Sequence, residues 1–248
     1  MASLEVMSRS ADAVSSTPAG RAAVGWGRQA WLIFHKDLRL ELSTGEVLTT
    51  SGFFAVLIVV IGSLSFFAGH DASAQVAPGV IWVAVAFAAV LALSRTWQRE
   101  REHDALSGLL ALPVRRSAIF AGKALALLTF VLAIELVVIP LTAVLFNLSL
   151  LRFAPGLVLL CLGATPGIAA AGTLFGAMTV RTAARDLVLA SVLFPLLAPT
   201  LLAAVTGTRA LFDGAPIGDL VDYLQLMGAF AVVFTAGGLG LFATLIES

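Results

Sequence analysis

The sequence predicts an all-α protein that crosses a membrane with six helices. Of its 248 residues, 59% are hydrophobic and only 12% are charged, whereas soluble domains average about 45–50% and about 25%. So little polar surface excludes an ordinary soluble enzyme. The apolar residues form long continuous runs, unlike the short alternating segments of a membrane β-barrel. The single cysteine, Cys161, excludes a disulfide framework, and the net charge of zero gives no indication of a nucleic-acid-binding surface.

Six stretches are long enough to span a bilayer, which takes about 20 apolar residues for about 30 Å of hydrocarbon. We expect the spans near 47–69, 76–94, 118–147, 153–180, 186–207 and 222–246. Residues 1–27 are rich in Ser, Ala and Gly without a sustained apolar period, which predicts a disordered N-terminal tail. The rest, 28–248, forms one transmembrane domain.

Basic residues predict the orientation. Five Lys and Arg precede the first span, six lie around 95–123 and two follow the fourth span, against only Arg152 and Arg209 on the other side. Because basic loops stay in the cytoplasm, both termini are expected there. Trp31 and Trp97 near the cytoplasmic boundary and Trp82 near the opposite one suggest aromatic belts.

Residues 28–46 predict an amphipathic helix that lies in the membrane interface ahead of the first span. Apolar residues recur at helical spacing, and charged residues fill the other face: Trp31, Phe34, Leu38 and Leu42 against Lys36, Asp37, Arg39 and Glu41. The helix is either a simple anchor or a contact for a specific partner.

The segment after the second span is the most informative loop. A charged cluster that includes Arg99, Glu100 and Asp104 is followed by leucines in helical rhythm, and Pro113 then ends the element. The leucines are Leu106, Leu109, Leu110 and Leu112. Such an apolar stripe either docks in a partner's groove or rests on the lipid surface.

A resemblance to a known family arises from this region. The second span opens with Ala77, Pro78, Gly79, Val80, Ile81, Trp82 and Val83. This opening, together with the loop that ends at Pro113, resembles the haem-exporter B (CcmB) family, the ABC permease of cytochrome c maturation. The similarity extends over about 28–246, although His103 to Ser107 depart from the family's usual loop sequence.

The resemblance implies a function and its partners. The 98–116 loop would dock on a separate cytoplasmic ABC ATPase that uses the ATP, with Arg99, Glu100, Asp104, Leu106, Leu109, Leu110, Leu112 and Pro113 as the coupling residues. The chain would be a permease subunit without enzymatic activity of its own, acting as a homodimer with haem-handling membrane proteins in the bacterial inner membrane. Haem is the candidate substrate, and we expect neither a bound cofactor nor a metal. The sequence agrees that energy comes from elsewhere, because Gly122-Lys123 is followed by Ala124 and so does not complete a P-loop.

Two residues inside the spans are candidates for intramembrane function. Glu135 is an acid within an apolar span, which is costly and therefore a functional hypothesis by default; the alternative is a protonated acid bonded to a neighbouring helix. Pro166 breaks the backbone pattern of a span whose Gly163/Gly167 and Gly172/Gly176 spacings favour close helix packing.

Other functions stay open at this stage. An ABC-2-type exporter of lipid, polysaccharide or drug would share the charged loop. A proton-driven carrier would use Glu135 and no ATPase. An intramembrane serine protease is disfavoured because the sequence lacks G-x-S-x-G. Haem iron often takes His ligands, which makes His70, at the outer end of the first span, a weak candidate.

Overall fold

The computed structural model describes residues 25–66, 70–102, 114–179 and 185–247, and within these ranges the regular structure is helical. The elements are α2 (Trp26–Thr44), α3 (Glu46–Ser65), α4 (His70–Glu102), α6 (Arg116–Leu145), α7 (Leu150–Thr179), α8 (Arg185–Phe212), the 3₁₀ turn η1 (Ile217–Leu220) and α9 (Val221–Glu247). Six helices are long and apolar enough to cross a membrane. The predicted fold class is therefore confirmed.

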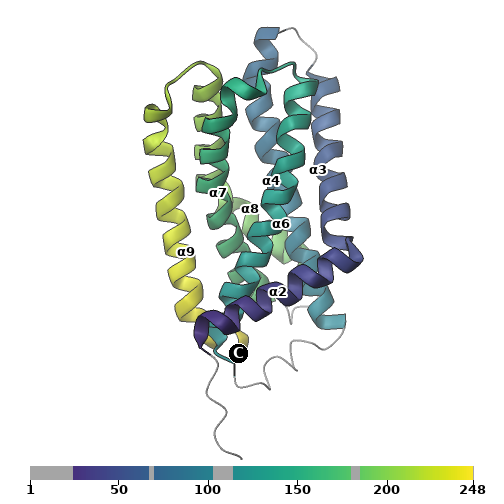
Figure 1. Ribbon diagram of the computed structural model, residues 1–248, viewed down its shortest axis with the longest axis vertical. Helices are drawn as coiled ribbons and strands as arrows, with labels where there is room; N and C mark the ends of the chain where they lie inside the picture. Colours follow the sequence, from purple (N-terminus) through teal and green to yellow (C-terminus); the bar gives the residue numbers. More distant parts are fainter. Residues whose placement is uncertain (1–24, 67–69, 103–113, 180–184, 248) are drawn as a thin grey trace, which may run out of the picture.

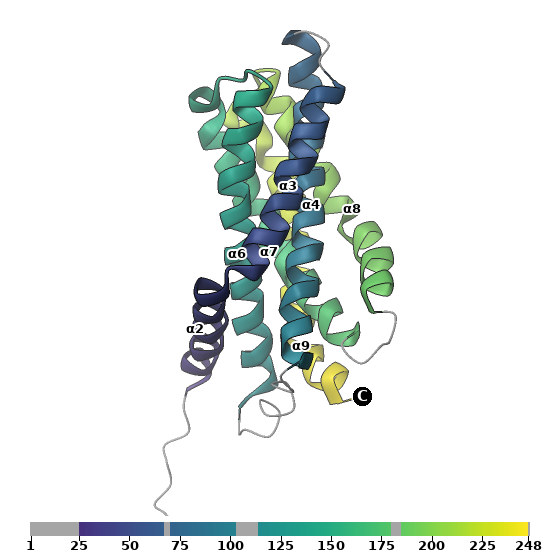
Figure 2. The same ribbon diagram turned by 90° about the vertical axis from the view of Figure 1, so that its right-hand side faces the viewer.

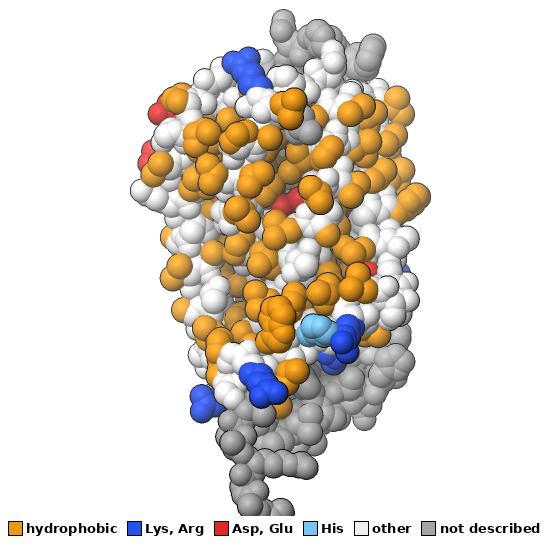
Figure 3. Space-filling model, in the orientation of Figure 1, with side chains coloured by type: hydrophobic (Ala, Val, Ile, Leu, Met, Phe, Trp, Pro, Cys, Tyr) orange, Lys and Arg blue, Asp and Glu red, His pale blue; other side chains and the backbone are white. Residues whose placement is uncertain are grey.

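The long helices stand side by side in a bundle, and α2 lies across one end of it (Figures 1 and 2). The C-terminal end of α9 lies at this same end, which we call the α2 end. Hydrophobic side chains cover the middle of the visible face, and Lys and Arg gather towards its two ends (Figure 3). A surface of this kind suits lipid around the middle and water at the ends, as a multi-pass membrane protein requires.

Helix α4 is longer than predicted. It runs without interruption to Glu102, so residues 95–102 belong to a helix and not to the loop expected after residue 94. Arg and Glu are good helix formers, and on the last turns of α4 they reach partners on α2. Pro166, which was expected to break the pattern of its span, lies inside α7, and Pro140, Pro195 and Pro199 likewise lie inside α6 or α8.

A single glycine makes the corner between α2 and α3. Gly45 has φ 64° and ψ 7°, ends α2 and precedes the first residue of α3. Its N–H donates to the Glu41 carbonyl at 2.6 Å, and its own carbonyl accepts from Thr49 at 2.9 Å. Because other residues are strained in this left-handed conformation, glycine is what allows the chain to turn from the end of the bundle into its first span.

The expected aromatic belts are only partly present. Trp31 is 57% exposed, but Trp82 and Trp97 are each 1% exposed and lie in the core. The Trp82 indole N–H donates to the Thr208 hydroxyl on α8 at 2.8 Å. Trp82 and Trp97 therefore join helices inside the bundle, and assigning them to lipid-facing aromatic belts was wrong.

The glycine spacings in α7 serve packing within the chain. A Cβ at Gly163 or Gly167 would meet side chains of α9, whereas one at Gly172 or Gly176 would meet Leu93 or Trp97 of α4. The expectation that these small residues allow close helix contact is confirmed.

Gly122 offers a test of how α2 is seated. A Cβ there would lie 2.7 Å from both the Ala30 carbonyl oxygen and the Ile33 Cβ on α2. We expect Gly122→Ala to displace α2 and to cost about 1–3 kcal/mol, the usual range for overpacking. Thermal unfolding in detergent, followed by Trp fluorescence, measures the loss.

Gly52→Ala is the matched control, because nothing lies within 4 Å of a Cβ at that position of α3. An unchanged melting temperature for Gly122→Ala would contradict the close contact between α2 and α6.

Candidate functional site

Helix α2 buries acids against the bundle and leaves apolar side chains outside. Asp37 and Glu41, one turn apart, are 6% and 1% exposed, whereas Trp31 and Leu42 are 57% and 76% exposed. The face predicted to be polar thus packs partly on protein. The outward apolar residues remain suited to the membrane interface, where an amphipathic helix places such side chains.

The first buried charge cluster joins α2, α4 and α6. The Lys123 ammonium of α6, with its side chain 1% exposed, donates to Glu100 Oε1 of α4 at 2.8 Å and to Asp37 Oδ2 of α2 at 3.3 Å. Lys36 donates to the same Glu100 oxygen at 2.7 Å and pairs with Asp37 at 3.1 Å. Two ammonium groups and two carboxylates therefore balance one another across three helices.

The carboxylates beside Lys36 stabilise the charged form of its ammonium. Burial would lower the pKa of the Lys36 ammonium, but the neighbouring Asp37 and Glu100 carboxylates outweigh it and hold that pKa above its ordinary value. The Lys123 ammonium also lies 5.1 Å from the centre of the Trp97 ring, within the range of a cation–π contact. Such pairing is what makes a buried lysine tolerable.

The second charge cluster links the last turns of α4 to the corner between α2 and α3. The Arg99 guanidinium donates to Glu41 at 2.9 Å, to Glu46 at 3.1 Å and to the Thr44 hydroxyl at 2.8 Å. Glu41 in turn accepts the backbone N–H groups of Val47 and Leu48 at 3.2 and 2.7 Å. Its carboxylate thereby satisfies donors left free at the start of α3 and lies favourably near that helix's positive end.

The end of the α4–α6 segment that leads into α6 is also hydrogen-bonded to α2. The Arg115 backbone N–H donates to the Gln29 side chain at 3.0 Å, and the Trp26 indole N–H donates to the Ser117 hydroxyl at 3.0 Å. We call these contacts, together with the two charge clusters, the α2 clamp. The clamp holds both ends of the 98–116 segment against one helix.

The predicted coupling residues fall into two groups. Arg99 and Glu100 lie on α4 within the α2 clamp. The remaining ones lie outside the described residues, and their positions stay predictions: Asp104, Leu106, Leu109, Leu110, Leu112 and Pro113.

The sequence motif that opens the second span lies on α4. Ala77 and Trp82 are buried in the core at 0% and 1% exposure, whereas Val83 faces outwards at 47%. Pro78 and Gly79 lie on the same stretch of α4. Through the bond from Trp82 to Thr208, the motif ties α4 to α8.

The structure places Glu135 in contact with Thr165, the residue before Pro166. The hydroxyl of Thr165 donates to Glu135 Oε1 at 2.7 Å and joins α7 to α6. The hydrogen bond to a neighbouring helix, one of the two alternatives for Glu135, is therefore present. It satisfies one of the two carboxylate oxygens.

Sequence reasoning missed the ion partners of Lys123. Lys123 lies within a predicted span, where a lysine requires a carboxylate, but it was counted only among the basic residues that predict orientation. Asp37 and Glu41, four residues apart on one helical face, were the complementary signal. Only the fold shows that they meet α4 and α6.

Comparison with known proteins agrees with the motif. A family described as "CcmB protein" matches residues 28–245, most of the chain. The chain belongs to the CcmB family. Its relatives include proteins named "Heme exporter protein B" from Rhodobacter capsulatus, 29% identical over 75% of this chain and 84% of the relative, and from Paracoccus denitrificans, 29% identical over 81% and 90%.

The match to a relative of the same name in Escherichia coli strain K12 is shorter. It is 28% identical over 96 residues, which cover 39% of this chain and 44% of that relative. The chain thus spans less than half of that relative's length, while most of its length aligns with the other two CcmB proteins.

Removing Lys123 tests the first charge cluster. In Lys123→Met, Asp37 and Glu100 lose their most buried cation, and we expect a loss of about 3–5 kcal/mol, as is usual when one partner of a buried ion pair is removed. Thermal unfolding in detergent provides the measurement.

Arg95→Met is the control, since Arg95 is 39% exposed and pairs with Glu46 only at 3.7 Å; it should cost at most about 1 kcal/mol. Equal melting temperatures for the two variants would show that the cluster does not hold α2 in place.

Proposed function

We propose that this chain is the membrane permease subunit of an ABC transporter complex that acts in haem export for the biogenesis of c-type cytochromes. The observation that carries the proposal is the CcmB family match over residues 28–245. It covers all six membrane-spanning helices. Relatives aligned along most of their length carry the name "Heme exporter protein B", and haem is accordingly the proposed substrate.

A separate cytoplasmic ATPase subunit is the proposed energy source. The sequence contains no G-x-x-x-x-G-K-[ST] stretch that would hold nucleotide phosphates. The α2 end carries the charged last turns of α4, and the distribution of basic residues favours a cytoplasmic location for it. The remaining proposed partners are a second copy of the chain and haem-handling membrane proteins of cytochrome c maturation.

The α2 clamp supports a coupling route from the 98–116 segment into the bundle. Displacement of this segment by the ATPase would move Arg99 and Glu100 at one end and Arg115 at the other. All three residues contact α2 or its corner with α3. Glu41 bonds to the first turn of α3, and Lys123 is part of α6. Movement of α2 would therefore reach α3 and α6 directly, because buried ion pairs resist separation.

Deletion of the gene tests the function. We expect cells that lack the chain to lose covalently bound haem in their c-type cytochromes, as seen by haem staining of membrane and periplasmic fractions. A plasmid copy should restore it. Normal cytochrome c in the deletion strain would overturn the proposal and favour an ABC-2-type exporter of another substrate.

Substitutions in the 98–116 segment test the docking site. Leu109→Asp combined with Leu110→Asp places charge on the proposed apolar docking stripe. We expect the amount of ATPase subunit that copurifies with this variant to be at least about tenfold lower than with the wild type, since each buried leucine contributes about 1.5–3 kcal/mol to binding. Membrane insertion and expression should be unchanged.

Ser107→Asp is the control, because it adds charge to the same segment without altering a leucine. Copurification of the ATPase at the wild-type level with the double variant would contradict docking on this stripe, and normal haem staining with that variant would contradict coupling through it.

A further inference from the structure

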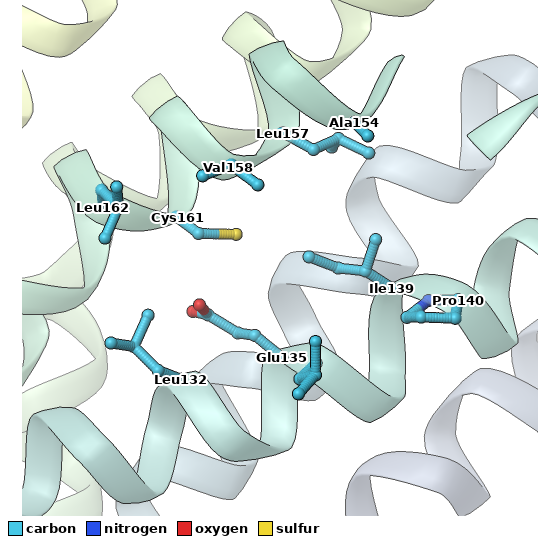
Figure 4. A pocket seen from close by; sticks show the side chains of 10 residues that line it. Leu132, Glu135, Ile139, Pro140, Ala154, Leu157, Val158, Cys161 and Leu162 are labelled. Atoms are coloured by element: carbon cyan, nitrogen blue, oxygen red, sulfur yellow. The ribbon is translucent and has the colours of Figure 1, made fainter. Parts of the chain in front are cut away.

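A pocket of about 280 Å³ lies between α6 and α7 (Figure 4), and none of the residues that line it belongs to the α2 clamp. Its inner wall is buried, with Glu135 and Leu157 2% and 4% exposed, whereas Leu136 and Val158 on its rim are 76% and 55% exposed. The pocket thus opens to the outer side of the bundle. Glu135 is ten residues before Leu145, the end of α6, so the opening lies about 15 Å from that end, within the hydrocarbon.

The Glu135 carboxyl is the polar feature of this pocket. Its side chain points into the space between the two helices, towards Cys161 (Figure 4). Oε1 accepts the Thr165 hydroxyl, whereas Oε2 is buried and accepts no N–H or O–H group among the described residues; the Cys161 thiol, a weak donor, faces the carboxyl. The other lining residues are apolar, apart from the Cys161 thiol.

A purely structural role would leave this second oxygen with no donor stronger than the Cys161 thiol. Buried polar atoms in native proteins are almost always paired, and each exception requires an account. An acid that served only to join α6 to α7 would need the Thr165 bond and no more. A lipid acyl chain could fill the apolar space, but it carries no donor for Oε2.

We propose that the pocket binds a small membrane-soluble molecule with an apolar body and one hydrogen-bond donor, a hydroxyl or an amine, which donates to Glu135 Oε2. The apolar wall takes the body, and the opening on the outer side of the bundle lets the molecule enter from the lipid. The volume is near the lower end of the range for ligand sites, which selects a small ligand. This site does not depend on the proposed role in haem export.

Dicyclohexylcarbodiimide is a suitable probe, because it is apolar and reacts with protonated carboxyl groups. The acid proton moves to one carbodiimide nitrogen, and the carboxyl oxygen bonds to the central carbon. An acyl shift to nitrogen then gives a stable N-acylurea that retains every atom of both reactants. In the full-length protein reconstituted in lipid nanodiscs, we expect labelling of Glu135 by peptide mass spectrometry, and none in Glu135→Gln.

Two comparisons test the ligand class and the route. Decanol should slow labelling roughly five- to tenfold more than decane at equal membrane concentration, because only the alcohol donates to Oε2. Val158→Trp, which enlarges a rim residue, should slow labelling about tenfold. Val137→Trp should not, because Val137 is 54% exposed on α6 but does not line the pocket.

Each outcome decides the proposal. Labelling of Glu135 with stronger protection by decanol supports it. Absence of labelling in the wild type, equal protection by decane, or unchanged labelling in Val158→Trp would overturn it. Binding of this kind and haem staining in cells are separate readouts, so failure of one leaves the other intact.

Discussion

The arrangement of helices at the α2 end of the bundle depends on the ion pairs that the buried Lys123 ammonium forms with Asp37 and Glu100. A lysine placed inside an apolar helix needs carboxylates close by, because transfer of its charge out of water costs several kcal/mol. Lys123 receives them from two different helices, Glu100 of α4 and Asp37 of α2. Sliding or lifting α2 would remove one of these partners. The position of α2 across the bundle is therefore determined by charge as much as by apolar packing.

The same requirement explains the course of the neighbouring elements. Helix α4 has to continue beyond residue 94 for Glu100 to reach Lys123, and the same turn presents the preceding residue, Arg99, to Glu41. Glu41 can bond to the start of α3 only because Gly45 turns the chain sharply after α2. The length of α4, the turn at Gly45 and the capping of α3 by Glu41 thus all accompany one set of charge contacts.

The sequence allowed the six long helices and their order to be predicted, because hydrophobic runs of this length have few other stable structures. It also allowed the family to be recognised from Ala77 to Val83 and the loop that follows. Residues in contact across the fold were harder to predict. Asp37 and Lys123 are 86 residues apart, and Trp82 and Thr208 are 126 apart. Local periodicity carries no information about such pairs, and this is also why Trp82 and Trp97 were mistaken for residues of the aromatic belts.

Lys123 and Glu135 are two buried ionisable groups of one helix that differ in how completely their side chains are paired within the chain. Both belong to α6, and both are 2% exposed. Lys123 donates to two carboxylates and faces an aromatic ring, so its surroundings within the chain account for its charge. Glu135 receives one hydroxyl for two oxygens and borders a pocket that opens outwards. The first arrangement is complete without any other molecule, as a structural role requires. The second leaves Oε2 with no donor stronger than the Cys161 thiol, and the proposed ligand would supply the missing one. Both groups share the cost of burial, so it is the difference in hydrogen bonding that separates the proposed ligand site from a structural charge.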